Sequence, residues 1–76
     1  MSHRVLSAGQ FWNHTGSLEA REITGVDDSN PQRVRVRHRP ADGRGFEYSD
    51  LEQDFLTDHN GPRSEQDALK RQGDSW

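Results

Sequence analysis

The stretch Arg33-Val34-Arg35-Val36-Arg37-His38-Arg39 decides the fold, because charged side chains alternate along it with valines and a histidine. Successive side chains of a β-strand point to opposite faces of a sheet. Val34, Val36 and His38 therefore share one face, and the four arginines share the other. The pattern predicts a strand with one buried face and one face in water.

The residues that follow this strand predict a hairpin. Residues 40–45 contain Asp42-Gly43, a typical turn pair, and Phe46-Glu47-Tyr48 then returns with both aromatic rings on one face. We expect His38 opposite Phe46, Val36 opposite Tyr48, and Arg37 opposite Glu47. A slip of one residue would set arginines against the aromatic rings, so this register is favoured.

The residues on either side predict a few more short elements. Phe11 and Trp12 start a first strand, and a bulge at Gly25 would bring Ile23 and Val26 to one face. Ser49-Asp50-Leu51-Glu52 has the form of a capping box. A helix of one to two turns would follow it, with its apolar side chains on one side: Leu51, Phe55 and Leu56.

Asn60-Gly61-Pro62 is expected to end that helix and the folded body. We therefore predict a domain over residues 1–59 and a flexible tail over 60–76, with room for a short, frayed helix over 65–72. The predicted fold class is mainly β. It is a small, strongly bent antiparallel sheet or SH3-like barrel with one short capping helix and a flexible C-terminal tail.

Residues 9–57 combine an opening that has aromatic residues, a histidine and a glycine with Ile23-Thr24-Gly25-Val26 and with later turn and core positions. The opening comprises Gln10, Phe11, Trp12, His14 and Gly16, and the later positions are Val34, Val36, Gly45, Phe46, Tyr48, Leu51 and Phe55. In these residues the chain resembles a class of short bacterial and phage proteins with SH3-like, or Tudor-like, β-barrels. The resemblance implies a small barrel and no particular activity.

Composition narrows the possible functions. With 76 residues there is room for one domain, and 28% of them are apolar while 30% are charged. Such a thin core cannot enclose a deep active site. The chain has no cysteine, which excludes disulfides and thiolate metal sites. Residues 1–6 contain no long apolar run, so we expect neither a signal peptide nor a membrane span. We expect a cytoplasmic protein that does not associate with membranes.

No set of residues has the spacing of a catalytic or metal site. The four histidines do not follow the spacing of metal ligands, and the serines lie in predicted turns or caps. Asn13-His14-Thr15 matches a glycosylation triplet, which we interpret as chance. We expect no cofactor, no metal and no enzymatic activity.

The arginine stripe and the acidic stretch after it are the candidate binding features. Residues 46–59 carry five acids and no lysine or arginine. The arginines could meet an acidic protein or a nucleic-acid backbone, or simply be a solvated face. The candidate partner-binding residues are Arg33, Arg35, Arg37, Arg39, Glu47, Asp50, Asp54 and Trp76.

These features favour a non-catalytic module that acts by protein–protein contact, such as an accessory or inhibitor protein of a phage or mobile element. The alternative is a nucleic-acid-binding small β-barrel that uses the Arg33, Arg35, Arg37 and Arg39 face. Exposed strand edges would also allow a homodimer by edge pairing.

Overall fold

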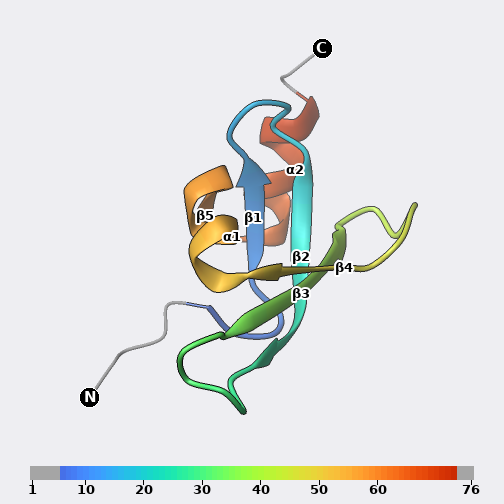
Figure 1. Ribbon diagram of the computed structural model, residues 1–76. Coiled ribbons are helices and arrows are strands. Elements are labelled where there is room, and N and C mark those ends of the chain that lie inside the picture. Colours follow the sequence, from blue (N-terminus) through green and yellow to red (C-terminus); the bar gives the residue numbers. More distant parts are fainter. Residues whose placement is uncertain (1–5, 74–76) are drawn as a thin grey trace.

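The computed structural model describes residues 6–73, which form five strands and two helices (Figure 1). In chain order these are β1 (Phe11–His14), β2 (Ala20–Asp27), β3 (Arg35–Pro40), β4 (Tyr48–Leu51), α1 (Glu52–Asp58), β5 (His59–Arg63) and α2 (Glu65–Gly73). The fold is therefore mainly β, as the sequence predicts.

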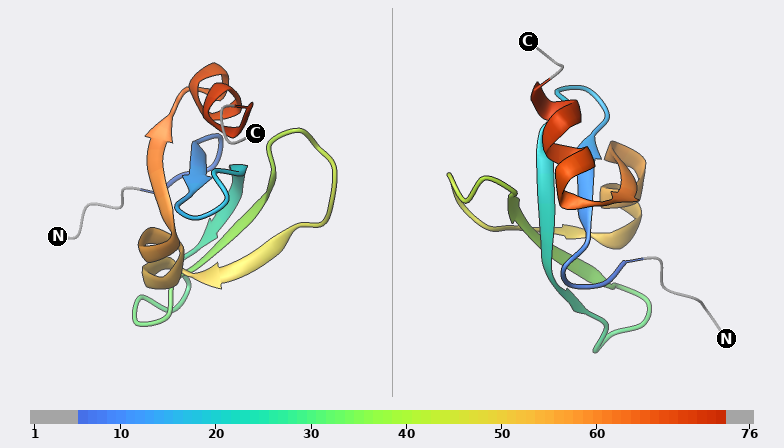
Figure 2. Two further views of the ribbon diagram at one scale, coloured as in Figure 1. Left: turned by 90° about the horizontal axis from the view of Figure 1, so that it is seen from above. Right: turned by 180° about the vertical axis from the view of Figure 1, so that it is seen from behind.

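All five strands belong to one antiparallel sheet in the order β4-β3-β2-β1-β5. Strands β1 to β4 form a meander, and α1 then carries the chain from β4 to β5 on the far side of β1. Seen from above, the sheet curls so that α1 spans the space between its two edge strands (Figure 2). The sheet is open, because β4 does not pair with β5.

The strand predicted over residues 33–39 is present as β3, but it begins two residues later, at Arg35. A turn closed by the Arg33 amide on the Asn30 carbonyl precedes it, while the predicted alternation of buried and exposed side chains holds. Val34, Val36 and His38 are buried, whereas Arg33, Arg35, Arg37 and Arg39 are exposed. We call the face that carries Val36 and His38 the inner face of the sheet, and the arginine side the outer face.

The predicted hairpin register is wrong by two residues. His38 pairs with Tyr48, Val36 with Asp50, and Arg37 with Ser49 rather than with Glu47. A shift of two leaves every side chain on its predicted face, so alternation alone cannot detect it. The observed register brings Asp50 to His38 and leaves Phe46 in the loop, where its side chain is 79% exposed.

The bulge in β2 lies where it is predicted. The register with β3 shifts between Ile23 and Gly25, and Val26 then pairs with Val36. Ile23 is fully buried, and Val26 packs against the same core. The extra residue thus brings both apolar side chains to the inner face.

The predicted capping box does not form. Ser49 lies within β4, and the residue before α1 is Leu51, whose side chain makes no capping hydrogen bond. Pairing with β3 holds Ser49, Asp50 and Leu51 extended, so the helix begins later than the local sequence suggests. The expected apolar side of the helix is reduced to Phe55, since Leu56 is 39% exposed.

The core lies between the inner face of the sheet and α1. It consists of Leu6, Trp12, Ile23, Val36 and Phe55. The rings of Trp12 and Phe55 meet edge to face, with their centroids 5.6 Å apart. Such pairs add to the stabilisation that burial of the rings gives.

The predicted boundary at residue 59 falls inside this fold, because residues 60–73, expected as a tail, contribute β5 and α2. β5 pairs with β1. Gly61 packs so closely against Trp12 that a Cβ at this position would lie 2.7 Å from the indole ring. The helix expected over 65–72 is present as α2, which packs on β1 and β2 and buries Ala68.

Polar contacts on the outer face hold α2 in place. Asn13 follows Trp12 on β1 and points to the opposite face, where its Nδ2 donates to the carbonyls of Leu18 and Ala68. Gln72 accepts a hydrogen bond from the Ala20 amide over 2.7 Å. The sequence analysis predicted a frayed helix because this segment has few apolar residues. These hydrogen bonds stabilise the helix without adding apolar residues. Buried Asn13 is also a poor glycosylation acceptor.

Candidate functional site

A polar hollow of about 280 Å³ lies on the inner face, beside the aromatic core. Every strand contributes to it, because the open sheet curls around it. Its lining consists of His14, Glu19, Arg21, His38, Tyr48, Asp50, Asp58 and His59. We call it the inner hollow.

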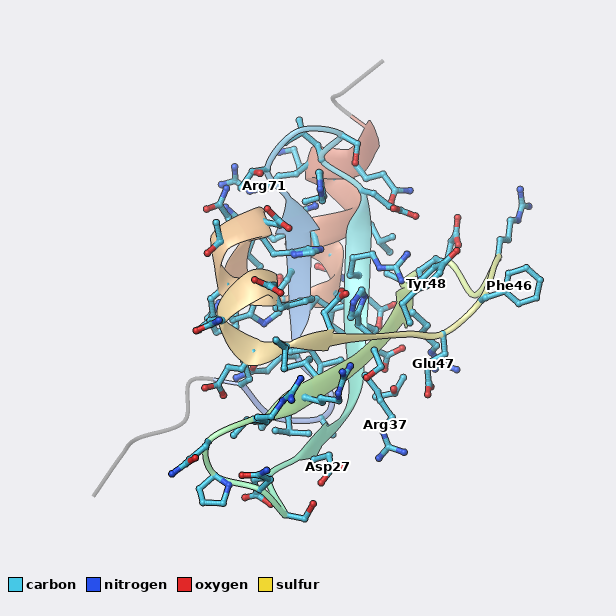
Figure 3. The ribbon with its side chains drawn as sticks, in the orientation of Figure 1. Asp27, Arg37, Phe46, Glu47, Tyr48 and Arg71 are labelled. Atoms are coloured by element: carbon cyan, nitrogen blue, oxygen red, sulfur yellow. The ribbon has the colours of Figure 1, made fainter. Side chains whose placement is uncertain are left out.

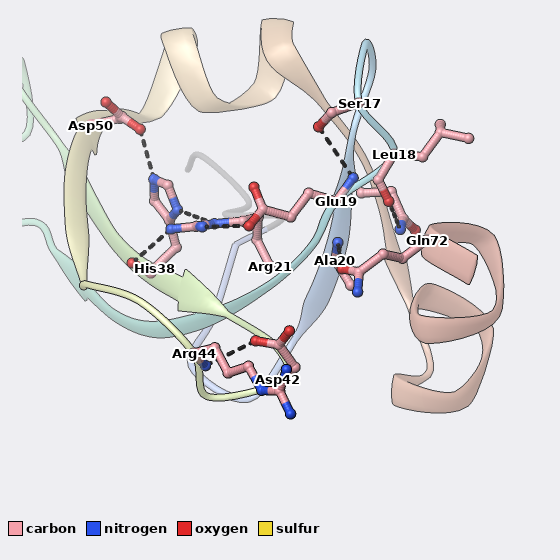
Figure 4. A network of polar contacts seen from close by, with 11 residues as sticks. Ser17, Leu18, Glu19, Ala20, Arg21, His38, Asp42, Arg44, Asp50 and Gln72 are labelled. Atoms are coloured by element: carbon pink, nitrogen blue, oxygen red, sulfur yellow. Dashed lines mark hydrogen bonds and ion pairs between the residues drawn. The ribbon is translucent and has the colours of Figure 1, made fainter. Parts of the chain in front are cut away.

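His38 lies at the base of the inner hollow with both ring nitrogens engaged (Figure 4). Arg21 Nε donates to His38 Nδ1 over 3.0 Å, so Nδ1 is the acceptor and carries no proton. The ring proton therefore lies on Nε2, which donates to Asp50 Oδ2 over 2.6 Å. A histidine held in this way cannot accept a proton from a substrate while both contacts persist.

Arg21 is a buried cation whose charge is balanced locally. Its NH1 lies 3.3 Å from Glu19 Oε1, and its NH2 donates to the carbonyl of His38. The guanidinium carbon also lies 5.4 Å from the centre of the Tyr48 ring. These contacts satisfy a group that is costly to bury alone, and they order the floor of the inner hollow.

His59 also lines the inner hollow, and its side chain is 8% exposed. Its ring stacks on Phe55 at a centroid distance of 4.0 Å, and Nδ1 donates to the Phe55 carbonyl over 3.0 Å. Burial lowers the pKa of His59 below its ordinary value, and the nearby His38, His14 and Arg21 lower it further, against the raising effect of the Phe55 hydrogen bond. His59 is therefore a neutral imidazole whose proton is on Nδ1.

Within the part of the chain that the structure describes, no group of three or more His, Cys, Asp or Glu residues is arranged to hold a metal ion. The contacts explain this arrangement. His14 uses Nδ1 to accept from the amides of Gly16 and Ser17, and both nitrogens of His38 are engaged. The histidine rings touch one another without converging on a common point.

The outer face carries the arginine stripe together with acids that offset it. Arg39 pairs with Glu22 at 2.9 Å, and the guanidinium of Arg37 lies over Gly25. Asp27 lies opposite Arg35 in the register of β2 with β3. Hydrogen bonds from Ser29 lower the pKa of Asp27, and the charges of Arg37 and Arg35 lower it further. The stripe is thus a mixed-charge surface.

The structure distributes the predicted site residues over three regions. Arg35, Arg37 and Arg39 share the outer face of β3, whereas Arg33 lies in the turn before it. Glu47 accepts a hydrogen bond from Thr24. Asp50 points to the inner hollow, and Asp54 is exposed on α1. Trp76 lies outside the described residues.

Comparisons with models of protein families, with curated proteins and with solved structures found no match. In the described part of the chain, no helix is long and apolar enough to cross a membrane.

Sequence reasoning missed most of the inner hollow. Arg21, Asp58 and His59 come from segments distant in sequence, and only the curl of the sheet brings them together. One signal was present: Arg21 lies two residues before Ile23, so strand alternation places it on the buried face.

The outer edge of β4 is the second notable feature of the surface. No described strand pairs with it, and Tyr48 in this strand is 56% exposed. Phe46, two residues before β4, projects away from the sheet (Figure 3). This combination places apolar side chains beside unpaired backbone groups.

Proposed function

We propose that this protein is a non-catalytic binding module that takes up an extended segment of another protein along the open edge of β4. The observation that carries the proposal is the unpaired β4 edge with Phe46 and Tyr48 beside it. Peptides add to sheet edges by main-chain hydrogen bonds, and neighbouring side chains give specificity.

The hydrogen-bond pattern indicates which backbone groups are available. The Glu52 amide donates to the Val34 carbonyl over 2.9 Å, one pair beyond the end of the ladder. Antiparallel pairs alternate, so the pairs of Asp50 and Tyr48 with β3 are also of the hydrogen-bonded kind. The N–H and C=O of Ser49 then point away from β3, towards a partner strand.

The two edges of the sheet differ in their protection. Natural edges are blocked by lysine, proline or bulges, which prevent unwanted pairing. β5 contains Pro62, which has no N–H to donate, whereas Tyr48-Ser49-Asp50-Leu51 of β4 has neither lysine nor proline. The side chain of Asp50 is turned to His38 and does not block the edge.

Within this proposal we assign the fold to the SH3-like group, as an open variant. The strand order, the bulge in β2 and the short helix before the last strand support this assignment. The mixed charge of the outer face makes that face the weaker candidate for a nucleic-acid partner.

Selection of peptides from a random display library, followed by amide NMR, tests the proposal. A selected peptide should protect the Ser49 amide from exchange and shift the resonances of β4. Phe46→Ala should weaken binding several-fold without loss of stability, because this side chain is exposed. Leu56→Ala, which removes an exposed apolar side chain from α1, is the matched control and should bind normally.

Two results would contradict the proposal. One is a set of selected peptides that leaves the β4 amides unchanged. The other is a stable dimer of this chain alone, measured by analytical ultracentrifugation, whose interface is β4, since the edge would then be used by a second copy.

A further inference from the structure

The inner hollow contains more negative charge than its own groups neutralise. Three carboxylates line it, those of Glu19, Asp50 and Asp58, and Arg21 is its only arginine or lysine. Arg21 pairs with Glu19, so the charges of Asp50 and Asp58 remain without a full cationic partner in the hollow. With neutral histidines the lining has a net charge of about −2.

The oxygens of these two carboxylates are available. Asp50 uses Oδ2 for His38, and no described residue contacts its other oxygen. The Asp58 side chain makes no hydrogen bond or ion pair with any residue in the range 6–73, although its backbone carbonyl accepts from the Thr15 amide. Both side chains are therefore free to accept hydrogen bonds from a ligand.

His59 supplies an independent acceptor of a different chemical kind. Its Nδ1 carries the proton that is donated to Phe55, which leaves a lone pair on Nε2. Nε2 has no hydrogen-bond partner among the described residues. Every fully buried polar side-chain atom in that part of the chain has a partner, so Nε2 is not fully buried and is accessible from the hollow. A side chain more than nine-tenths buried thus presents an unused acceptor there.

We propose that the inner hollow binds a cationic hydrogen-bond donor, namely the guanidinium or primary ammonium group of a basic side chain on a partner protein. A group of this kind satisfies the Asp50 and Asp58 oxygens and His59 Nε2 together, and its alkyl chain can lie along the Tyr48 ring. The volume of about 280 Å³ suits one side chain. This inference does not depend on strand addition at β4.

Titration with small probes, followed by two-dimensional NMR, tests the inference. The probes are N-acetyl-arginine amide and N-acetyl-lysine amide, with N-acetyl-norleucine amide as the neutral control. A trimethyl-lysine derivative, which keeps the charge but has no N–H, separates hydrogen bonding from charge alone. We expect saturable shifts at Tyr48, Asp58 and His59 with the first two probes, at a Kd on the order of 1 mM.

Asp58→Asn should weaken this binding about tenfold, because it removes a full charge whose side chain has no structural partner. Asp54→Asn is the matched control: it makes the same change at an exposed position of α1 that does not line the hollow.

Three results would overturn the inference. The arginine and lysine probes could give no saturable shift, the neutral or trimethylated probe could bind equally well, or Asp54→Asn could weaken binding as much as Asp58→Asn. Retention of the native amide spectrum in each variant ensures that a loss of binding is not a loss of folding.

Discussion

Arg21 determines which ring nitrogen of His38 is the acceptor, because Arg21 Nε–H donates to His38 Nδ1 over 3.0 Å. A guanidinium has only donors, so the ring nitrogen it meets must be the acceptor. The ring proton then belongs to Nε2 and Asp50. Three strands, β2, β3 and β4, are thereby joined by one chain of hydrogen bonds beside the core.

We predict that ¹⁵N NMR of the imidazole will show His38 as the Nε2–H tautomer, with Nδ1 unprotonated. Arg21→Met should lower the free energy of unfolding by about 1–3 kcal/mol, because it leaves a buried ring nitrogen without its donor. Arg44→Met, at an exposed loop position, is the control and should have little effect. Observation of the Nδ1–H tautomer in the unmodified protein would contradict the assignment.

The core prediction concerns Phe55, whose side chain is 1% exposed and contacts Trp12, His38 and His59. Phe55→Ala should cost about 3–5 kcal/mol in chemical denaturation, as expected for truncation of a buried ring. Leu56→Ala, at the neighbouring position whose side chain is 39% exposed, should cost clearly less. Equal effects of the two changes would show that α1 does not pack as described.

A charge at Ala68 tests whether α2 belongs to the folded body. Ala68 is fully buried against the outer side of β1 and β2, so Ala68→Glu should lower the unfolding free energy by more than about 2 kcal/mol. Gln66→Glu introduces the same charge at an exposed position of the helix and should be nearly neutral. If both variants unfold at the temperature of the unmodified protein, α2 contributes nothing to stability.

The lowered pKa of His59 predicts that the folded protein loses stability in mild acid. Its pKa in the folded protein is below the ordinary value of 6.5, so the unfolded chain binds the proton more readily. This contribution is complete above pH 6.5 and decreases as the pH falls towards the folded pKa. The groups around it are His14, His38 and Arg21, and the carboxylates of Asp50 and Asp58 line the same hollow.

Urea titrations at a series of pH values measure this effect. His59→Gln should flatten the dependence of stability on pH below 6.5, although it lowers stability at neutral pH. An unchanged slope in this variant would assign the acid sensitivity to other groups.

The mixed charge of the outer face predicts that nucleic acid binds there weakly and only by electrostatic attraction. Glu22 and Asp27 lie among the arginines, so a short DNA duplex should bind only at low ionic strength and should dissociate by about 0.15 M salt. Arg35→Glu with Arg37→Glu should abolish even this binding in a fluorescence anisotropy titration, whereas Arg71→Glu on α2 should not. Tight binding at 0.15 M salt would make the nucleic-acid alternative the better one.

The sequence analysis predicted correctly those features that depend on the spacing of apolar side chains within a single strand. The alternation in 33–39 and the bulge near Gly25 depend on local apolar spacing, and both are confirmed. The hairpin register was wrong because alternation cannot distinguish registers that differ by two residues. The capping box was wrong because pairing with β3 holds Ser49 and Asp50 in a strand.

The inner hollow could not be predicted for a related reason. Its groups come from all five strands, from α1 and from the turn before β2, and their meeting depends on the curl of the whole sheet. The contribution of α2 depends on amide side chains, Asn13 and Gln72, whose partners are backbone groups far away in sequence.

The inequality of the two sheet edges limits how copies of this molecule could assemble. A polymer built by head-to-tail addition of strands needs a receptive edge on each side of every subunit. Pro62 lies in β5, so that side offers a poor template, and only β4 is suited to pairing. Growth through β4 would therefore close after two subunits, related by a twofold axis, and fibrils would not follow from this edge.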